Sequence, residues 1–175
     1  MSSKLRVMVV DDSALNRRTI GDVLGALDGV EVVGKAADGD EALRLAQSLA
    51  PDLITLDLEM PRMDGFTFLR LLMARQPTAV IVISGSGRES VGRAMELGAV
   101  DCVAKGQRDG PGIELELAEK VAALRAQSVA GRPLLKRPLP QRFPTRTPFA
   151  PERPAPVEKI EREKDGAGLT RLVVI

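Results

Sequence analysis

Five polar residues that could do chemistry together stand where short apolar runs of the sequence end. They are Asp11, Asp12, Asp57, Ser84 and Lys105. An acid at the end of a buried segment is costly unless a metal ion, a cation or a reaction of the carboxylate itself compensates its charge. Neighbouring carboxylates also repel one another, and Mg²⁺, which prefers oxygen ligands, would relieve that repulsion. The set predicts a magnesium site built from two or three carboxylates and a backbone carbonyl.

The chemistry that suits this set is phosphoryl transfer. The ammonium group of Lys105 and the hydroxyl of Ser84, together with Mg²⁺, would form a clamp for a phosphoryl group. The remaining nucleophile is a carboxylate, so an aspartyl phosphate on Asp57 is the expected product. The chain has no His and a single Cys, which excludes His-dependent catalysis and soft-metal sites within it. Cys102 has no base to activate it and is expected to be a small core residue.

Taken one at a time, these residues also have purely structural interpretations. Asp12 is equally well explained as the cap of a following helix, a role that Ser13 could also take. Ser84 alone fits a turn, Lys105 alone fits a solvated cation, and Asp57 alone fits a loop acid. The functional interpretation is preferred because independent caps and turns need not fall on the same edge of one sheet.

The elements that would position these residues alternate five times between strand and helix. Short, apolar, β-branched runs predict strands near residues 5–10, 30–36, 53–56, 79–83 and 100–104. Apolar residues at helical spacing predict helices between them and a closing helix near Ile113. This order predicts an α/β fold with a doubly wound, five-stranded parallel sheet. In such a sheet ligands bind at the carboxyl ends of the strands, where the five polar residues stand.

The composition changes after residue 127. Residues 128–168 hold eight of the twelve prolines, and residues 132–164 carry nine Lys and Arg against four Asp and Glu. Such a segment cannot bury a core, so we expect a disordered, basic, Pro/Arg-rich flexible linker. Nucleic-acid binding by this tail is the weaker alternative, because only Phe143 and Phe149 offer stacking. Residues 169–175 are again apolar and β-branched, and are expected to be the truncated first strand of a following domain.

The composition of the whole chain narrows the function classes. Apolar residues make up 44% of the sequence, with four Phe and no Trp or Tyr, so an aliphatic core is expected. A net charge of +1 gives no overall field for nucleic acid or an acidic membrane, and neither is expected as a partner. No apolar run approaches the length of a membrane span, and a lone Cys fits a reducing compartment. The expected location is the cytoplasm.

With these residues in place, the sequence resembles a two-component response-regulator receiver domain, which has a flavodoxin-like fold. The resemblance covers about residues 4–126, within an expected receiver of residues 1–127. It rests on Val9-Val10-Asp11-Asp12-Ser13, on Asp57 before Met60-Pro61 and Met63-Asp64-Gly65, and on Ser84 and Lys105. It implies that Asp57 is the phosphoacceptor, supplied by a phosphohistidine of a chemotaxis-type sensor histidine kinase.

The resemblance also implies a role for the neighbouring residues. Asp12 and Asp57 would ligate Mg²⁺ with the backbone carbonyl of Glu59, and Asp11 would act largely through water. The residues implied to contact the phosphoryl group and transmit the switch are Ser84 and Lys105. The sequence departs from the family pattern at Cys102, where an aromatic residue is usual, and at Gly106, where Pro is usual.

Within that superfamily the stretches 57–69 and 94–101 are similar to the chemotaxis protein-glutamate methylesterases. In that family a Pro-rich linker joins the receiver to an esterase domain that opens with a strand like residues 172–175, followed by a Gly-Ala-Ser motif. This chain stops before that motif, so the catalytic Ser, His and Asp of the esterase are absent and no methylesterase activity is expected of these 175 residues. The resemblance implies that phosphorylation regulates an attached methylesterase domain, which acts on chemoreceptors.

Two other functions remain as alternatives. The first is a stand-alone receiver whose basic tail or signalling face binds a partner protein. The second is an aspartyl-phosphate hydrolase for small metabolites, which would want a second Asp two residues after the nucleophile, where this sequence has Glu59.

Overall fold

The computed structural model describes residues 4–85, 87–105, 112–131, 134–135, 160–164 and 170–174. The chain divides into two units, Met1–Gln141 and Arg142–Ile175, and each is described by itself. In the second unit β6 (Ile160–Lys164) pairs antiparallel with β7 (Thr170–Val174). Strand β6 falls inside the range predicted as a linker, and β7 lies within the range predicted as a strand. The rest of the predicted linker lies mostly outside the described residues, so the linker stays a prediction.

The first unit is built on one five-stranded parallel sheet in the order β2-β1-β3-β4-β5. The strands are β1 (Leu5–Val10), β2 (Val30–Ala36), β3 (Leu53–Asp57), β4 (Ala79–Ser84) and β5 (Asp101–Ala104). Every residue of β3 and β4 is buried, because helices cover both faces of the sheet at its centre. This burial explains why their sequences are continuous apolar runs. The predicted fold class of this unit, a doubly wound parallel α/β sheet, is confirmed.

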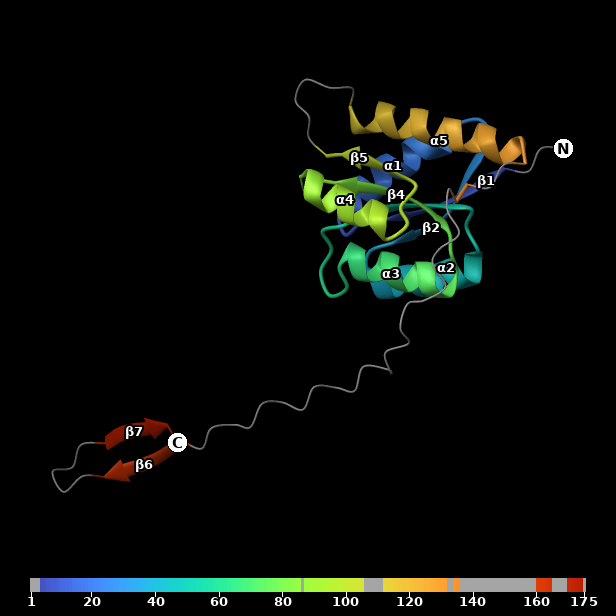
Figure 1. The fold of residues 1–175 in the computed structure, drawn as a ribbon. Helices are drawn as coiled ribbons and strands as arrows, with labels where there is room; N and C mark the ends of the chain where they lie inside the picture. The colour runs from blue at the N-terminus through green and yellow to red at the C-terminus, as the bar shows by residue number, and fades with distance from the viewer. Residues whose placement is uncertain are drawn as a thin grey trace. The chain divides into compact units, whose positions relative to one another are not determined.

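Five helices cover the two faces of the sheet (Figure 1). On one face lie α1 (Ala14–Gly25) and α5 (Ile113–Val129). On the other lie α2 (Gly39–Leu49), α3 (Gly65–Arg75) and α4 (Arg88–Glu96). Each face has its own cluster of aliphatic side chains, and Phe68 is the largest fully buried residue. The clusters take in Leu134 and Leu135 as partly buried neighbours, past the predicted domain end at residue 127.

Side-chain caps begin the helices that follow β1, β2 and β3. Ser13 caps α1, so of the two residues considered for this cap Ser13 is the one the structure uses. The carboxylate of Asp38 accepts from the backbone N–H of Glu41 at 2.9 Å, and that of Asp64 from the N–H of Thr67 at 2.8 Å. These caps fix where the three helices begin.

Helix α4 is held differently from the other helices. Its N-cap residue is Gly87, which offers no side-chain cap; the helix contains Gly92, and Ala94 is its one buried residue. Its further attachment is to α3, where the guanidinium of Arg93 lies over the ring of Phe66 at 4.5 Å from the ring centroid.

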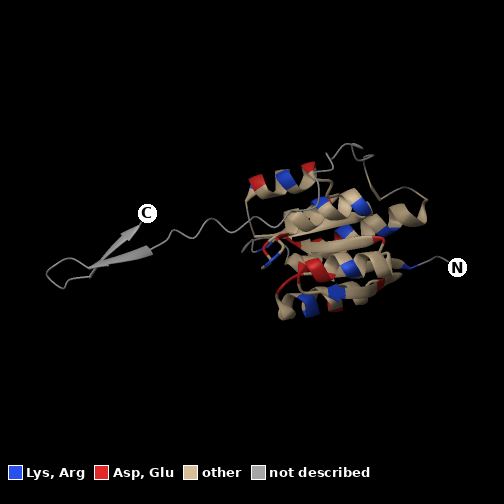
Figure 2. Ribbon diagram, turned by 90° about the horizontal axis from the view of Figure 1, so that it is seen from below, with Lys and Arg blue, Asp and Glu red and all other residues tan. Residues whose placement is uncertain are grey.

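Charged residues of both signs are interspersed over the helices and turns of the first unit (Figure 2). This mixing agrees with the near-zero net charge of the sequence. Among the described residues, none of the helices has the length and apolar character needed to cross a bilayer.

Candidate functional site

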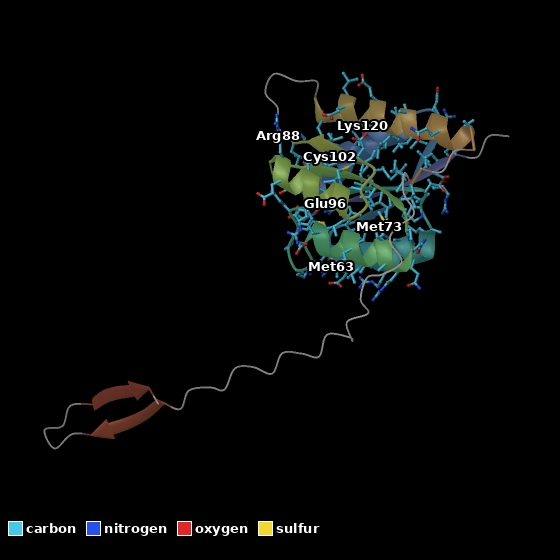
Figure 3. All side chains as sticks on the ribbon, in the orientation of Figure 1. Met63, Met73, Arg88, Glu96, Cys102 and Lys120 are labelled. Carbon is cyan, nitrogen blue, oxygen red and sulfur yellow. The ribbon has the colours of Figure 1, made fainter. Side chains whose placement is uncertain are left out.

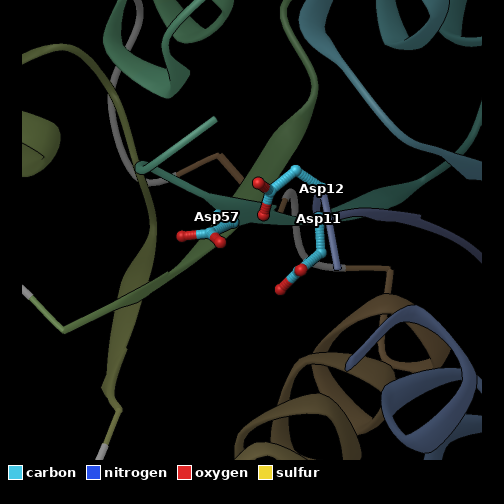
Figure 4. A group of neighbouring side chains, drawn as sticks. All are labelled: Asp11, Asp12 and Asp57. Carbon is cyan, nitrogen blue, oxygen red and sulfur yellow. The ribbon is translucent and has the colours of Figure 1, made fainter. Parts of the chain in front are cut away.

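Three carboxylates converge where β1 and β3 end (Figure 4). Asp11 and Asp12 follow β1, and Asp57 is the last residue of the adjacent strand β3. One carboxylate oxygen from each lies within 4.8 Å of the others. Asp11 and Asp57 are only 1% and 3% exposed, whereas Asp12 is exposed to solvent. The structure thus brings together the acids that the sequence placed at two separate strand ends.

Lys105 supplies the positive charge next to this cluster. Its Nζ lies 2.5 Å from Oδ2 of Asp57 and 3.4 Å from Oδ2 of Asp11. The backbone N–H of Lys105 donates to the carbonyl of Ser84 at 2.8 Å, which aligns the ends of β4 and β5. One ammonium group therefore contacts two buried carboxylates.

Ser84 lies at the same edge of the sheet. It is the buried last residue of β4, the strand next to β3, where Asp57 is in register with Ile83. Strand pairing thus places Ser84 beside Asp57. Lys105, which follows β5 on the far side of β4, contacts Asp57 through its side chain.

The protonation of the pair follows from burial and pairing. Burial raises the pKa of Asp57, and the hydrogen bonds from Lys105 and from the backbone N–H of Glu59, at 3.1 Å, only partly counteract that effect. Burial alone would lower the pKa of Lys105, but its hydrogen bond to Asp57 and the charges of Asp57 and Asp11 raise it above the usual value. Lys105 is therefore a fixed cation, and the negative charge on Asp57 calls for further positive charge.

The donor set fits a hard divalent cation. It consists of carboxylate oxygens, with no imidazole in the chain and Cys102 as its one thiol. Oxygen donors of this kind suit Mg²⁺ rather than zinc or copper. One ammonium cannot balance three carboxylates, and the exposed Asp12 gives an ion access from solvent. These residues therefore fit the magnesium ion that the sequence predicts.

Asn16 and Arg17 hold the acids in place, and neither was predicted from the sequence. The Nδ2 of Asn16 lies 3.3 Å from both carboxylate oxygens of Asp11, and Ser13 donates its backbone N–H to Oδ1 of the same carboxylate at 2.9 Å. The guanidinium of Arg17 donates to the backbone carbonyls of Asp11 and Asp12 at 2.7 and 2.9 Å. Their position in the first helical turn after the acids was the available signal, because helical side chains tilt toward the N-terminus.

Gly65 brings the start of α3 against the backbone of Asp57. Its N–H donates to the carbonyl of Leu58 at 3.0 Å. A Cβ atom at this position would lie 2.5 Å from the carbonyl oxygen of Asp57 and 2.6 Å from Cα of Leu58. The site backbone thus requires glycine here, which explains the Asp64-Gly65 pair in the sequence.

Cys102 lies outside this cluster. It is half-buried on β5 and packs at the edge of the core cluster under α4, so the core prediction holds in part. Burial raises the pKa of its thiol, and the carboxylate of Asp101 raises it further. The thiol form prevails, as expected for a packing residue rather than a nucleophile. The other departure from the family pattern, Gly106, lies outside the described residues.

Comparison with protein families identifies the receiver family. The model of the response regulator receiver domain matches residues 7–112, which include β2 to β5, most of β1 and all of the candidate site residues.

Individual proteins that resemble this chain point to the same family. A protein-glutamate methylesterase/protein-glutamine glutaminase of Anaeromyxobacter dehalogenans is 55% identical over 70% of this chain and 35% of its own length. One of Halalkalibacterium halodurans is 43% identical over 91% of this chain and 46% of its own length. The chain therefore spans less than half of either relative. Among solved structures, the response regulator domain of Thermotoga maritima CheB has a TM-score of 0.64 at 35% identity, covering 73% of this chain and 97% of that one.

Proposed function

Because this chain belongs to the response regulator receiver family, of the type found in protein-glutamate methylesterases, we propose that it is a phosphoacceptor for a sensor histidine kinase. Asp57 is the proposed acceptor. The observation that carries the proposal is the contact at 2.5 Å between Lys105 and Asp57, inside a cluster of three carboxylates. A buried carboxylate fixed by a cation, with solvent access through Asp12, is suited to attack a phosphoryl group.

The proposed reaction is a displacement at phosphorus. A carboxylate oxygen of Asp57 attacks the phosphoryl group, forming an O–P bond, while the N–P bond to the donor histidine breaks and its electron pair stays on the imidazole nitrogen. The ammonium of Lys105 offsets the negative charge on the transferring oxygens, and the hydroxyl of Ser84 hydrogen-bonds one of them. The N–H of Glu59 and Nζ of Lys105 orient the two oxygens of Asp57 before the reaction.

Mg²⁺ held by Asp11, Asp12, Asp57 and the backbone carbonyl of Glu59 would supply the positive charge that this cluster lacks. Asn16 and the N–H of Ser13 orient the buried carboxylate of Asp11 toward that role. Arg17 holds the backbone carbonyls of Asp11 and Asp12, which fixes the turn that carries the two acids after β1.

The proposed output is control of a protein-glutamate methylesterase domain on the same polypeptide, and through it of chemoreceptors. The relatives that carry this activity in their names support the proposal. Residues 128–168 would act as the linker between the two domains, and residues 169–175 would begin the second. We propose a cytoplasmic protein that binds neither nucleic acid nor membrane.

The phosphoacceptor role is tested with acetyl phosphate and Mg²⁺, followed by the mass of the intact protein. We expect one added phosphoryl group on the wild type, none on Asp57→Asn, and none on the wild type with EDTA. Unchanged mass of the wild type, or a phosphoryl group that persists in Asp57→Asn, contradicts the proposal.

The output is tested separately by the coding sequence that follows Ile175. A continuation like Gly-Ala-Ser supports the attached methylesterase. A stop codon at that point supports the stand-alone receiver instead.

A further inference from the structure

The loop between Asp57 and α3 is held at both ends but exposed in the middle. At its start Glu59 donates to Asp57, and at its end Gly65 donates to Leu58. Between them Pro61 and Arg62 are exposed. An exposed loop of this length keeps one conformation only if something outside it holds it in place.

Arg62 provides such a contact. Its φ angle is +68°, a left-handed conformation that is unfavourable for a non-glycine residue. Its guanidinium forms an ion pair with Oδ2 of Asp38. The other oxygen of that carboxylate, Oδ1, caps α2 by accepting from Glu41. Each oxygen of Asp38 therefore has its own partner, and the loop is tied to the N-terminus of a helix.

Met63 makes a second contact with the same corner. A Cβ atom at Gly39, the first residue of α2, would lie 2.7 Å from Cγ and Sδ of Met63. The methionine side chain thus lies directly on the glycine backbone (Met63 is labelled in Figure 3). Arg62 and Met63 together hold the loop against residues 38 and 39, and we call this pair of contacts the α2 clamp.

The α2 clamp joins the two segments that flank the three carboxylates of Asp11, Asp12 and Asp57. In the strand order β2-β1-β3, the turn from β2 into α2 and the loop after β3 lie on either side of the end of β1. Asp11 and Asp12 follow β1, and the N–H of Asp11 donates to the carbonyl of Ala36 at 3.2 Å. A contact between these two flanking segments therefore fixes one side of the site relative to the other.

We propose that Arg62 is a positioning residue, which through Asp38 holds the loop after Asp57 in the conformation that binds a divalent cation. The inference rests on the proposed function, because the loop contributes the carbonyl of Glu59 to the cation. Arg62 itself touches neither the cation nor the phosphoryl group. Its loss leaves every proposed ligand in place but lets their relative positions vary, which weakens binding.

The test measures Mg²⁺ affinity by isothermal titration calorimetry on the full chain. We expect Arg62→Ala to raise the Kd for Mg²⁺ by about threefold to tenfold. Asp38→Asn, which keeps the helix cap because Asn caps as well as Asp, should do the same. The double variant should be no weaker than either single one, because both remove the same contact.

Two further variants separate the ion pair from other causes. Arg62→Gly is free of the positive-φ cost but has no guanidinium, so it should bind Mg²⁺ as weakly as Arg62→Ala. Arg70→Ala removes an exposed arginine of α3 and should bind like the wild type. Hydrogen exchange at the amides of Glu59 and Met63 should be faster in Arg62→Ala and Arg62→Gly than in the wild type, and unchanged in Arg70→Ala.

The result that overturns the clamp is wild-type Mg²⁺ affinity in Arg62→Ala and Asp38→Asn, or additive losses in the double variant. Thermal unfolding without Mg²⁺ serves as a check, because a merely structural loss would lower the midpoint of both variants along with the affinity. Failure of the proposed function looks different. In that case the wild type itself binds no Mg²⁺ or gains no phosphoryl group.

Discussion

The ammonium of Lys105 and the carboxylate of Asp57, 48 residues apart in the sequence, lie 2.5 Å apart at the carboxyl edge of the sheet. The same ammonium lies 3.4 Å from Asp11, so one fixed cation already occupies part of the space between two proposed metal ligands. Lys105 and a divalent cation must then share these carboxylates. Because of this sharing, we expect Lys105 to weaken the binding of the metal ion but to speed phosphorylation.

Lys105→Met should bind Mg²⁺ about threefold to tenfold more tightly, because a competing and repelling charge is gone. It should also accept a phosphoryl group from acetyl phosphate about tenfold more slowly or worse, because nothing replaces the ammonium on the transferring oxygens. Titration calorimetry and time-resolved intact mass measure the two effects. Lys4→Met, an exposed lysine outside the site, should change neither. Weaker Mg²⁺ binding in Lys105→Met would contradict the sharing of carboxylates.

Gly65→Ala should lower the free energy of unfolding by about 1–3 kcal/mol, because its Cβ meets backbone atoms that cannot move aside. The atoms concerned belong to Asp57 and Leu58, so Mg²⁺ affinity should fall as well. Gly92→Ala is the matched control. It lies within α4 with nothing within 4 Å of its Cβ position, and should stabilise the protein by about 0.5–1 kcal/mol. Urea unfolding followed by circular dichroism measures both, and equal effects would show that steric contact at Gly65 is not the cause.

Thr55→Val should stabilise the protein by about 1 kcal/mol, because it replaces a buried hydroxyl by a methyl group of similar size. Thr55 is in the middle of β3 at 0% exposure, and its Oγ1 has no hydrogen-bond partner among the residues that the structure describes. Thr78→Val is the contrasting change, since that hydroxyl donates to the carbonyl of Gln76 at 2.9 Å. It should destabilise the protein by about 1 kcal/mol. The same unfolding experiment decides, and a destabilised Thr55→Val would reveal a partner for that hydroxyl.

The ammonium of Lys120 should contribute stability that disappears in alkali. Partial burial alone would lower the pKa of Lys120, but the hydrogen bond from Nζ to Asp101 at 2.9 Å and the charges of Asp101 and Glu116 raise it above the usual 10.5. A raised pKa means that this contribution is fully present below pH 10.5 and is lost as the pH rises through the higher folded-state value. Figure 3 labels Lys120 on helix α5.

The measurement compares the free energies of unfolding of the wild type and Lys120→Met on either side of pH 10.5. The two proteins should differ at neutral pH and converge in alkali, where other lysines titrate in both. A constant difference across that range would exclude a role for the charge of Lys120.

Much of the fold could be predicted from the sequence, because the spacing of apolar residues along the chain indicates which segments form strands and which form helices. The buried strands β3 and β4 are unbroken apolar runs, and a parallel sheet brings their carboxyl ends to one edge. This topology is also why the sequence alone places Asp57 and Ser84 near each other. Strand ends therefore carried most of the information about the site.

The contacts that hold the site could not be predicted in the same way. The pair of Arg62 and Asp38 joins two loops through the ends of long side chains, and no periodicity marks such a contact. The positive φ angle of Arg62 was equally hidden, since Gly or Asn would have been the usual signal. Asn16 was overlooked for a related reason, because its amide acts on the cluster from a helix rather than from a strand end.

The weak attachment of α4 implies an uneven distribution of local stability over the sheet. A helix with one buried residue, no side-chain cap and an internal glycine is expected to open at a lower free energy than the buried strands. Strand β4, which leads into it, is buried along its whole length, so its backbone hydrogen bonds are expected to open at a much higher free energy. Among the described residues, a strand that is buried along its whole length and a weakly attached helix are therefore neighbours in the sequence, separated by the few residues that follow Ser84.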